Sequence, residues 1–168
     1  MNEMNQIEIG KVVVNVGIGQ VGEDVEKAKN LVEKITGRQA VKTESKDSAK
    51  TFGLRKGLKI GAMTTLRGEE AAEFLEKVFT AVEEIEASQF DDKGNFAFGI
   101  GEYIDVSGVD YDADIGMMGF EVSVNLERPG YRVKRRDYKP SDIGEDHIVD
   151  SEDAIEFVED RFDVEVKQ

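Results

Sequence analysis

Apolar residues recur at helical spacing in three segments of the chain. Residues 23–36 predict a helix that Gly37 stops, with one apolar face made of Val25, Ala28, Leu31, Val32 and Ile35. Residues 69–87 predict a longer helix, whose inward positions are Ala71, Ala72, Phe74, Leu75, Val78, Phe79, Val82 and Ile85. Residues 151–161 predict a third helix, with Ser151 as its cap, acidic residues in its first turn, and Ile155 and Val158 turned inward.

Strict alternation of apolar and polar residues predicts the strands. In residues 119–126 one face consists of Phe120, Val122, Val124 and Leu126. The first strand sets Lys11, Val13 and Asn15 opposite Val12, Val14 and Val16. Residues 60–67, 95–101 and about 40–45 complete the set, with Phe96 and Phe98 expected in the core. Such alternation is typical of half-buried antiparallel strands. We therefore expect an α+β fold: a mainly antiparallel sheet with helices packed on one face and an open polar face.

The polar positions of these strands would share the face without helices. They carry short hydrogen-bonding groups and a few cations: Lys11, Asn15, Thr65, Arg67, Ser123 and Asn125. Such a face fits the shallow minor groove of an RNA helix, where shape, 2′-hydroxyl groups and phosphates are read.

Length and composition bound the class of protein. The 168 residues suit one domain over 1–168, with a basic loop at about 128–139 and an acidic helical segment at about 150–168 as an appendage. The chain is 39% hydrophobic, without an apolar run of membrane-spanning length or a signal-peptide pattern. We therefore expect a soluble cytoplasmic protein with no membrane partner. The absence of cysteine excludes disulfides, thiolate zinc sites and cysteine nucleophiles.

Charge is distributed unevenly along the chain. The formal net charge is −14, and so acidic a surface repels nucleic acid. Yet residues 38–59 and 128–139 each carry +5, whereas residues 69–92, 102–127 and 140–168 carry −8, −7 and −9. Two cationic segments in an acidic chain favour an anionic partner. Acidic surfaces also keep proteins hydrated in molar salt, where the screening length is about 3 Å, so we expect a halophilic host.

GIGQVG, residues 17–22, matches the glycine fingerprint of dinucleotide-binding proteins. In those proteins the helix N-terminus holds the pyrophosphate, but here Glu23 and Asp24 would repel it. The following strand, Val41 to Glu44, is short and polar, whereas a central parallel strand is a continuous apolar run. We therefore expect these glycines to let another backbone approach closely.

Other partial motifs predict neither a catalytic nor a metal site. The spacing of a calcium loop is met by Asp110, Asp112, Asp114 and Glu121, but Ile115 stands where the turn needs glycine. His147 is the single histidine and has no partner pattern near it. We expect no cofactor, no metal and no enzymatic activity.

Longer motifs together resemble one known family. In chain order they are KVVVNVGIG, ITGRQAVKT, F-x-x-R-x-G-x-x-IG at 52–61, TLRG at 65–68, FDDKGNFAFG, YDADIGMMG and NLERPGYRV. From about Ile7 to its end the chain is similar to the fifth large-subunit ribosomal protein, the universal 5S rRNA-binding family, in its archaeal form. The resemblance implies an α+β fold whose concave sheet face docks on 5S rRNA in the central protuberance. It also implies a loop that reaches towards the tRNA in the peptidyl site.

The resemblance also assigns residues. Asn15 and Thr65 match family positions that touch 5S rRNA, and Arg38 stands where the family has a glutamine, with Gln39 beside it. The remaining candidates for rRNA binding are Lys11, Gly17, Lys42, Arg67, Ser123 and Asn125. The tRNA-facing loop contains Lys50, Phe52, Arg55, Lys56, Gly57 and Lys59. Further RNA contacts are expected from Arg128, Arg132, Lys134, Arg135 and Arg136.

Two positions depart from the family pattern. Lys59 replaces a proline and Met63 replaces a lysine, which predicts a more mobile loop and one phosphate contact fewer.

The partners that the resemblance implies are 5S rRNA, large-subunit rRNA, peptidyl-site tRNA, neighbouring ribosomal proteins and a small-subunit bridge protein. Two other classes of protein stay open: a nucleotide-binding enzyme that uses GIGQVG, and an adaptor whose acidic helices bind proteins.

Overall fold

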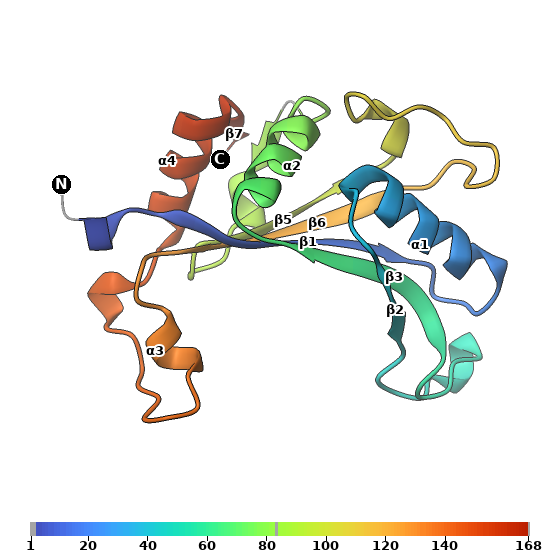
Figure 1. Ribbon diagram of the computed structural model, residues 1–168, viewed down its shortest axis with the longest axis horizontal. Coiled ribbons are helices and arrows are strands. Elements are labelled where there is room, and N and C mark those ends of the chain that lie inside the picture. The colour runs from blue at the N-terminus through green and yellow to red at the C-terminus, as the bar shows by residue number, and fades with distance from the viewer. Residues whose placement is uncertain (1–2, 83, 168) are drawn as a thin grey trace. The chain divides into compact units, whose positions relative to one another are not determined.

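The computed structural model describes residues 3–82 and 84–167, which form an α+β fold (Figure 1). One sheet has the strand order β2-β3-β1-β6-β5, made of β1 Glu8–Gly17, β2 Val41–Glu44, β3 Lys59–Leu66, β5 Asn95–Ile100 and β6 Phe120–Glu127. A second, parallel pair joins β4 Glu84–Glu86 and β7 Glu165–Lys167. The helices are α1 Glu23–Thr36, α2 Glu69–Phe79, α3 Arg132–Arg135 and α4 Ser151–Phe162. The predicted α+β fold with a mainly antiparallel sheet is confirmed.

The chain is organised as two compact units. Unit 1 comprises Met1–Val12, Arg67–Phe98 and Val124–Gln168, and unit 2 comprises Val13–Leu66 and Gly99–Ser123. Strands β1, β5 and β6 each contribute residues to both units. Each unit has its own buried residues and is described separately below.

In unit 2, helix α1 lies along one face of β3 (Figure 1). The helix spans the predicted residues, and its five predicted inward residues are all buried. Gly37 ends it in the left-handed conformation, with φ of 67°, which glycine adopts without a steric penalty. The strands contribute Val14, Val16, Ala62 and Leu66 to the same core, each at most 2% exposed. The periodicity of apolar residues was enough to predict this helix, because a helix that packs on a sheet buries one stripe of its surface.

The close approach of two backbones in unit 2 occurs at Gly61. A Cβ atom there would lie 2.5 Å from the carbonyl oxygen of Val16 and 2.8 Å from Oγ1 of Thr43. By contrast, a Cβ atom at Gly17, Gly19 or Gly22 would meet nothing within 4 Å. Another backbone does approach residues 17–22, because the Ile60 carbonyl accepts from the backbone N–H groups of Ile18 at 2.9 Å and Gly19 at 3.1 Å. The position that needs a missing side chain for this approach is nevertheless Gly61. Gly19 and Gly22 have φ of 72° and 150°, so these glycines serve the turn from β1 into α1.

Residues 102–118 form a loop of unit 2 that Tyr103 holds in place. This tyrosine is fully buried, and its hydroxyl accepts a hydrogen bond of 2.8 Å from the Asp112 backbone N–H. The Asp112 carboxylate accepts from the Asp114 backbone N–H at 3.0 Å and from Lys34 Nζ at 3.2 Å. These two donors, the backbone one first, lower the pKa of Asp112. The calcium-like acidic residues therefore belong to a fastened loop, apart from Glu121, which lies in β6.

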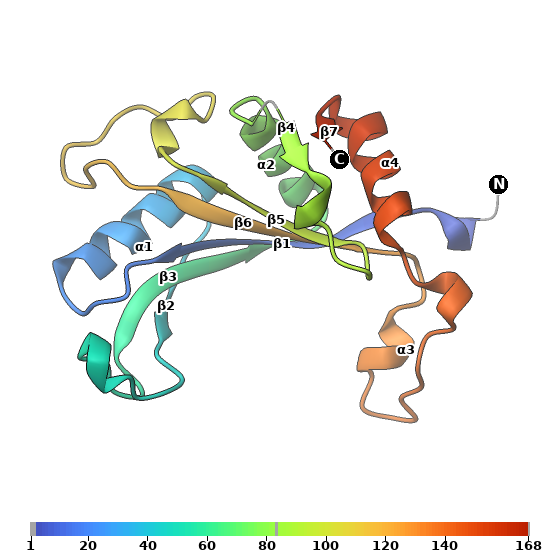
Figure 2. The same ribbon diagram turned by 180° about the vertical axis from the view of Figure 1, so that it is seen from behind.

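In unit 1, α2 and α4 lie on the same side of the strands, and α3 lies on the other side (Figure 2). Phe79 of α2 stacks on Phe98 at a centroid distance of 5.3 Å and contacts Phe162 of α4 at 4.9 Å. Phe96 and Phe98 are 3% and 4% exposed, which confirms that they are core residues. The aromatic contacts therefore tie both helices to strand β5.

The second predicted helix is too long by eight residues. It ends at Phe79, and residues 84–86 form β4, which pairs with β7 at the end of the chain. Ile85 is 1% exposed, whereas Glu84 and Glu86 on either side of it are exposed, which is the alternation of a strand. The prediction missed this alternation because residues 78, 82 and 85 also fit the spacing of a helix. Helix α4 runs one residue past its predicted end. Its cap is Asp150 rather than Ser151, because the Asp150 carboxylate accepts from the Asp153 N–H at 2.8 Å.

Candidate nucleic-acid interface

Among the described residues of unit 2, no α-helix lies on the strand face opposite α1 (Figure 1). Thr65 of β3 is exposed and Asn15 of β1 is half-buried on this face. Among the described residues, neither side chain forms a hydrogen bond, so both keep their donors and acceptors available. Half-buried Met63 lies on this face beside Thr65, as the alternation of residues 60–67 predicts, and Val41, 60% exposed, adds a second apolar group.

Lys42 lies on the other side of this sheet. It stands directly opposite Ala62 in the antiparallel β2–β3 register, and opposite residues point to the same face. Ala62 is fully buried under α1, and Lys42 forms an ion pair with Glu26 of that helix. The hydrogen bond from Lys42 lowers the pKa of Glu26. The structure thus separates Lys42 from Asn15 and Thr65 and makes it part of the helix–strand contact.

The turn between α1 and β2 presents Arg38 and Gln39 to solvent. Thr36 Oγ1 accepts from the Arg38 backbone N–H at 3.3 Å, and the Gln39 carbonyl accepts from Thr64 Oγ1 at 3.1 Å. These bonds fix the backbone and leave the Gln39 side chain exposed. Two more exposed candidates of unit 2 lie on strands: Gly17 at the end of β1 and Ser123 on β6.

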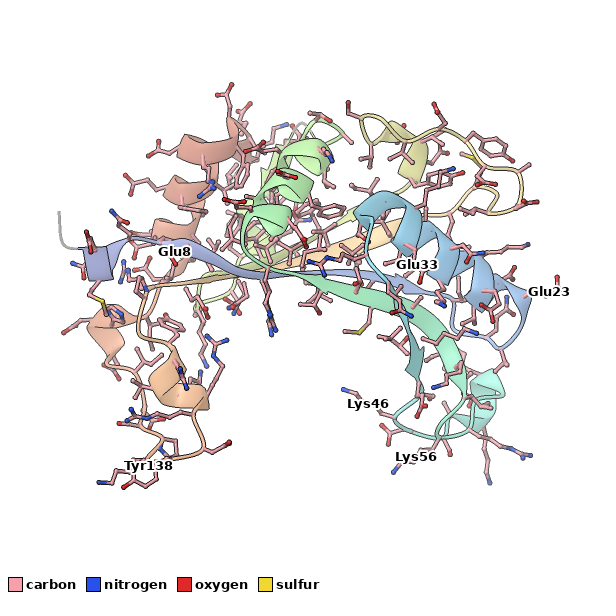
Figure 3. The ribbon with its side chains drawn as sticks, in the orientation of Figure 1. Glu8, Glu23, Glu33, Lys46, Lys56 and Tyr138 are labelled. Carbon is pink, nitrogen blue, oxygen red and sulfur yellow. The ribbon has the colours of Figure 1, made fainter. Side chains whose placement is uncertain are left out.

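Residues 45–58 of unit 2 form a loop rich in exposed cations: Lys46, Lys50, Arg55 and Lys56. Lys46 and Lys56 lie far from α1 in Figure 3. Backbone hydrogen bonds of 2.8 to 3.0 Å join Ser45 to Leu58 at the base of the loop and Ala49 to Leu54 within it. The short helix Lys50–Phe52 holds Phe52 at the surface, 77% exposed. Lys59, after the loop, pairs with Glu44 across the β2–β3 strands and lowers its pKa through a hydrogen bond.

In unit 1, a row of amides crosses neighbouring strands. Asn125 Nδ2 donates to Asn95 Oδ1 at 2.6 Å, and Asn95 Nδ2 donates to the Asp91 carboxylate at 2.7 Å. Burial raises the pKa of Asp91, but hydrogen bonds from Asn95 and Lys93 outweigh burial, so the pKa is lowered overall. Asn125 is therefore held in one orientation by its neighbours.

A hollow of about 540 Å³ in unit 1 brings together two sets of candidates that are distant in sequence. Lys11 and Asn125 come from the strands, and Lys134 and Arg135 come from the basic segment, residues 128–139. Of the remaining candidates, Arg67 lies exposed directly after β3. Within the described chain, Lys11, Arg67 and Lys134 form no ion pair. Glu127, Asp142 and Glu145 also line the hollow, so Lys11 and Lys134 lie near carboxylates there, whereas Arg67 is exposed to solvent.

The basic segment contains α3, a one-turn helix, where the sequence predicted only a loop. Its arginines differ in their surroundings. The Arg128 side chain is 14% exposed and bonds to Asp153 of α4 at 2.5 Å and to the Ile148 carbonyl at 3.3 Å. Arg135 pairs with Glu127 at 2.5 Å but stays 55% exposed, and Arg132 and Arg136 are exposed. Arg128 is thus tied into the unit, whereas the others face solvent.

The motifs that could suggest nucleotide binding, catalysis or metal binding have structural surroundings instead. Glu23 and Asp24 begin α1 directly after the glycine turn, where a dinucleotide fold needs its phosphate site. His147 Nε2 lies 2.8 Å from the Pro129 carbonyl and so supports the turn before α3. No group of three or more histidine, aspartate or glutamate side chains in the described residues is arranged to hold a metal ion. Nor does any helix of residues 3–82 and 84–167 combine the length and the apolar character that crossing a bilayer requires.

The fold and these surfaces define a class of protein. They describe an α+β protein with open strand faces and exposed cationic segments, a combination suited to RNA. Family comparison is more specific: residues 2–55 match the model of ribosomal protein L5, and residues 59–157 match the model of the C-terminus of the same ribosomal family. The chain belongs to the ribosomal protein L5 family. It is a ribosomal protein, and the alternative of a nucleotide-binding enzyme is set aside.

Individual relatives match over nearly their whole length. Large ribosomal subunit protein uL5 of Sulfurisphaera tokodaii is 44% identical, over 99% of this chain and 95% of that protein. The proteins of the same name from Sulfolobus acidocaldarius and Methanococcus maripaludis are each 42% identical. The matches cover 98% and 97% of this chain and 93% and 92% of those proteins.

Proposed function

We propose that this chain is a structural component of the large ribosomal subunit that binds 5S rRNA and helps attach it in the central protuberance. The name of the relatives, large ribosomal subunit protein uL5, supports the place in the cytoplasmic ribosome. The resemblance of the sequence motifs to the 5S rRNA-binding family supports the choice of RNA. The role is architectural: the protein holds RNA by shape and hydrogen bonding and catalyses no reaction.

One observation carries the proposed docking face. Asn15 and Thr65 lie on neighbouring strands, with side chains unpaired within the described chain, while the residues beside them in sequence are buried under α1. Val14, Val16 and Leu66 anchor the strands, so the two polar groups are held facing outward before RNA arrives. Preorganised groups lose little entropy on binding and can meet 2′-hydroxyls and phosphates of a minor groove.

Changing Asn15→Ala together with Thr65→Ala is expected to weaken 5S rRNA binding without altering the fold. A lost hydrogen bond costs about 0.5–1.5 kcal/mol, so the pair should cost about 1–3 kcal/mol, or roughly 5- to 150-fold in Kd. Mobility-shift titration with 5S rRNA at one KCl concentration measures this. The matched control is Asn30→Ala with Ser107→Ala, two exposed polar residues of unit 2 away from this face. Equal affinity of the double variant and the wild type would refute the docking face.

The cationic segments extend the proposal to other partners. The loop 45–58 is assigned to the peptidyl-site tRNA, because its four exposed cations and Phe52 offer both phosphate contacts and a stacking surface. The exposed arginines of the basic segment are assigned to large-subunit rRNA, and Arg128 is left out because it is bound internally. Neighbouring ribosomal proteins, including a small-subunit bridge protein, are the remaining proposed partners.

We also propose a halophilic host, on the strength of the net charge of −14. Dilution of KCl should destabilise the protein, because like charges in residues 69–92 and 140–168 lose their screening. Each loss of about 1 kcal/mol lowers the Tm by about 2–4 °C for a chain of this size. Circular dichroism melting across a KCl series measures the effect, and Glu73→Gln with Glu76→Gln on α2 should reduce it. A Tm that does not respond to KCl would count against this origin.

A further inference from the structure

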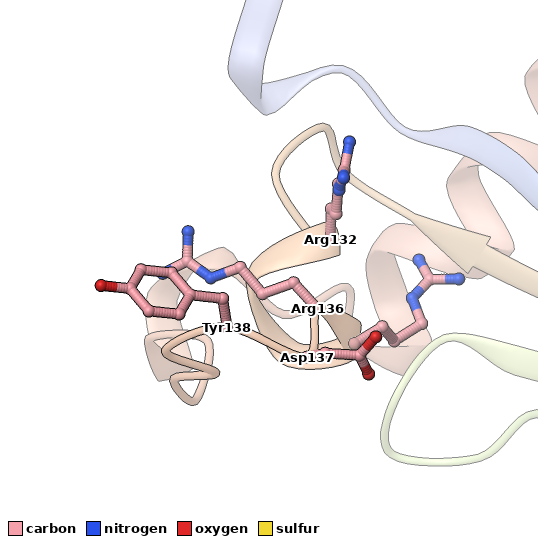
Figure 4. Close-up of a pocket in the computed structure, with 5 residues that line it drawn as sticks. Arg132, Arg136, Asp137 and Tyr138 are labelled. Carbon is pink, nitrogen blue, oxygen red and sulfur yellow. The ribbon is translucent and has the colours of Figure 1, made fainter.

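The tip of the basic segment, residues 136–139, combines an exposed aromatic ring with exposed cations. Tyr138 is 77% exposed, although a tyrosine side chain in a folded protein usually buries its ring. A hollow beside it is lined by Arg132, Arg135, Arg136, Asp137 and Tyr138 (Figure 4). We propose that this tip binds one unpaired nucleotide of ribosomal RNA, with the base stacked on Tyr138 and its phosphates held by Arg132 and Arg136.

The side chains around Tyr138 are arranged for this ligand. Lys139 Nζ lies over the Tyr138 ring, 5.4 Å from its centre, in a cation–π contact that adds positive charge at one face of the ring. Arg136 and Tyr138 extend to the same side of the chain, whereas the Asp137 carboxylate points to the opposite side (Figure 4). The hollow is therefore lined by three arginines against one carboxylate, and that carboxylate is turned away from Tyr138.

The backbone of the tip is held in an unusual conformation. Lys139 has φ of 46°, in the left-handed region that residues other than glycine rarely adopt, and it precedes Pro140. Arg136 Nε donates to the Lys139 carbonyl at 2.8 Å, and the Ser141 N–H donates to the Val133 carbonyl at 3.1 Å. Strain that is held in place by such bonds occurs most often at functional sites. Here it fixes Tyr138 at the surface of unit 1.

The chemistry of the ring selects an unpaired base. In an RNA helix both faces of each base are covered by stacked neighbours, so an aromatic side chain finds a free face only on an unstacked nucleotide. Tyr111 provides the contrast: it is also exposed, at 58%, but lies between Asp110 and Asp112, where a nucleotide is repelled. Exposure of a tyrosine is therefore not the whole signal, and its cationic surroundings supply the rest.

The inference rests on the proposed role in the ribosome but can fail separately from it. The probes are a short RNA duplex with one unpaired 2-aminopurine nucleotide and the same duplex with that nucleotide paired. The full chain should bind the first more tightly by roughly 5- to 150-fold, the range that stacking of one base provides, and 2-aminopurine fluorescence should change on binding. Tyr138→Leu should abolish this preference, Tyr138→Phe should keep it, and Tyr111→Leu serves as the matched control.

Each other outcome overturns the inference. It is wrong if the wild type binds both duplexes equally or neither of them, or if Tyr138→Leu retains the preference. Binding of 5S rRNA is measured in parallel with the same preparations. If 5S rRNA still binds in a manner that depends on Asn15 and Thr65 while the preference is absent, the docking face stands and only the nucleotide site falls. Because Tyr138 is exposed, its replacement should leave the Tm unchanged, which circular dichroism verifies.

Discussion

Gly61→Ala is expected to lower the free energy of unfolding by about 2–3 kcal/mol. The new methyl group would lie 2.5 Å from the Val16 carbonyl oxygen, and neither atom can move without displacing a strand. Strands β1 and β3 would separate at the place where Asn15 and Thr65 are held, so 5S rRNA binding should weaken as well. Denaturant unfolding followed by circular dichroism measures the stability, and RNA titration at a temperature where the variant is folded measures the binding.

Gly99→Ala is the matched control for this substitution. Gly99 also lies within a strand, β5, but it is exposed, has an ordinary φ and would place its new methyl group in open space. Its replacement should change stability little or raise it slightly, because alanine restricts the unfolded chain more than glycine does. If both variants lose the same stability, the loss reflects a general intolerance of glycine replacement and the close approach at Gly61 is not its cause.

Charge reversal by Arg135→Glu with Arg136→Glu is expected to weaken association with large-subunit rRNA and to flatten its salt dependence. Each phosphate contact adds about 0.7–0.9 decade of affinity for a tenfold fall in salt, so losing two should cost roughly 25- to 60-fold at the lower salt. Stability should hardly change, because the Arg135 side chain is 55% exposed, although that of Glu127 is 21% exposed, and pairs with an exposed partner contribute less than about 1 kcal/mol. Association constants across a KCl series and thermal melting provide the two measurements.

The control reverses two cations elsewhere, Lys27→Glu with Lys29→Glu on α1. These lysines form partly exposed pairs with Asp24 and Glu33, and the total charge changes equally. A control variant that loses as much affinity would show that net charge alone governs binding. A double reversal at Arg135 and Arg136 that melts the protein, yet leaves the affinity of each folded molecule unchanged, would mean that the basic segment is an internal clamp.

Local pattern predicted the elements whose burial follows one period. Helix α1 was predicted with its observed ends, because five apolar residues form one stripe and Gly37 supplies the left-handed stop. Strand β6 alternates without exception from Phe120 to Leu126, with each apolar residue buried. Where a residue's neighbours along the chain determine its environment, the sequence was sufficient.

Helix α2 shows where this approach fails. Val78, Val82 and Ile85 keep helical spacing, yet Ile85 lies in a strand because β7, about eighty residues later, pairs with it. A three-residue strand forms its backbone hydrogen bonds only with its partner strand, so the sequence around it contains no pattern that predicts it. The cap of α4 could not be predicted from the local sequence either, because Asp150 and Ser151 are both good capping residues. The folded structure determines which of the two caps the helix.

The sequence by itself determined the α+β class, the alternation of the strands, the two cationic segments and the family of this protein. Tertiary structure decided which candidates can act together. It turned Lys42 to the helix side, bound Arg128 to Asp153, and brought Lys11 and Asn125 into one hollow with Lys134 and Arg135. It also showed that, in the close backbone contact at residues 17–19, the position without room for a side chain is Gly61 on the facing strand. Charge and period are properties of neighbours along the chain, whereas strand register and ion pairing join residues distant in sequence, and only the folded packing selects among their possible partners.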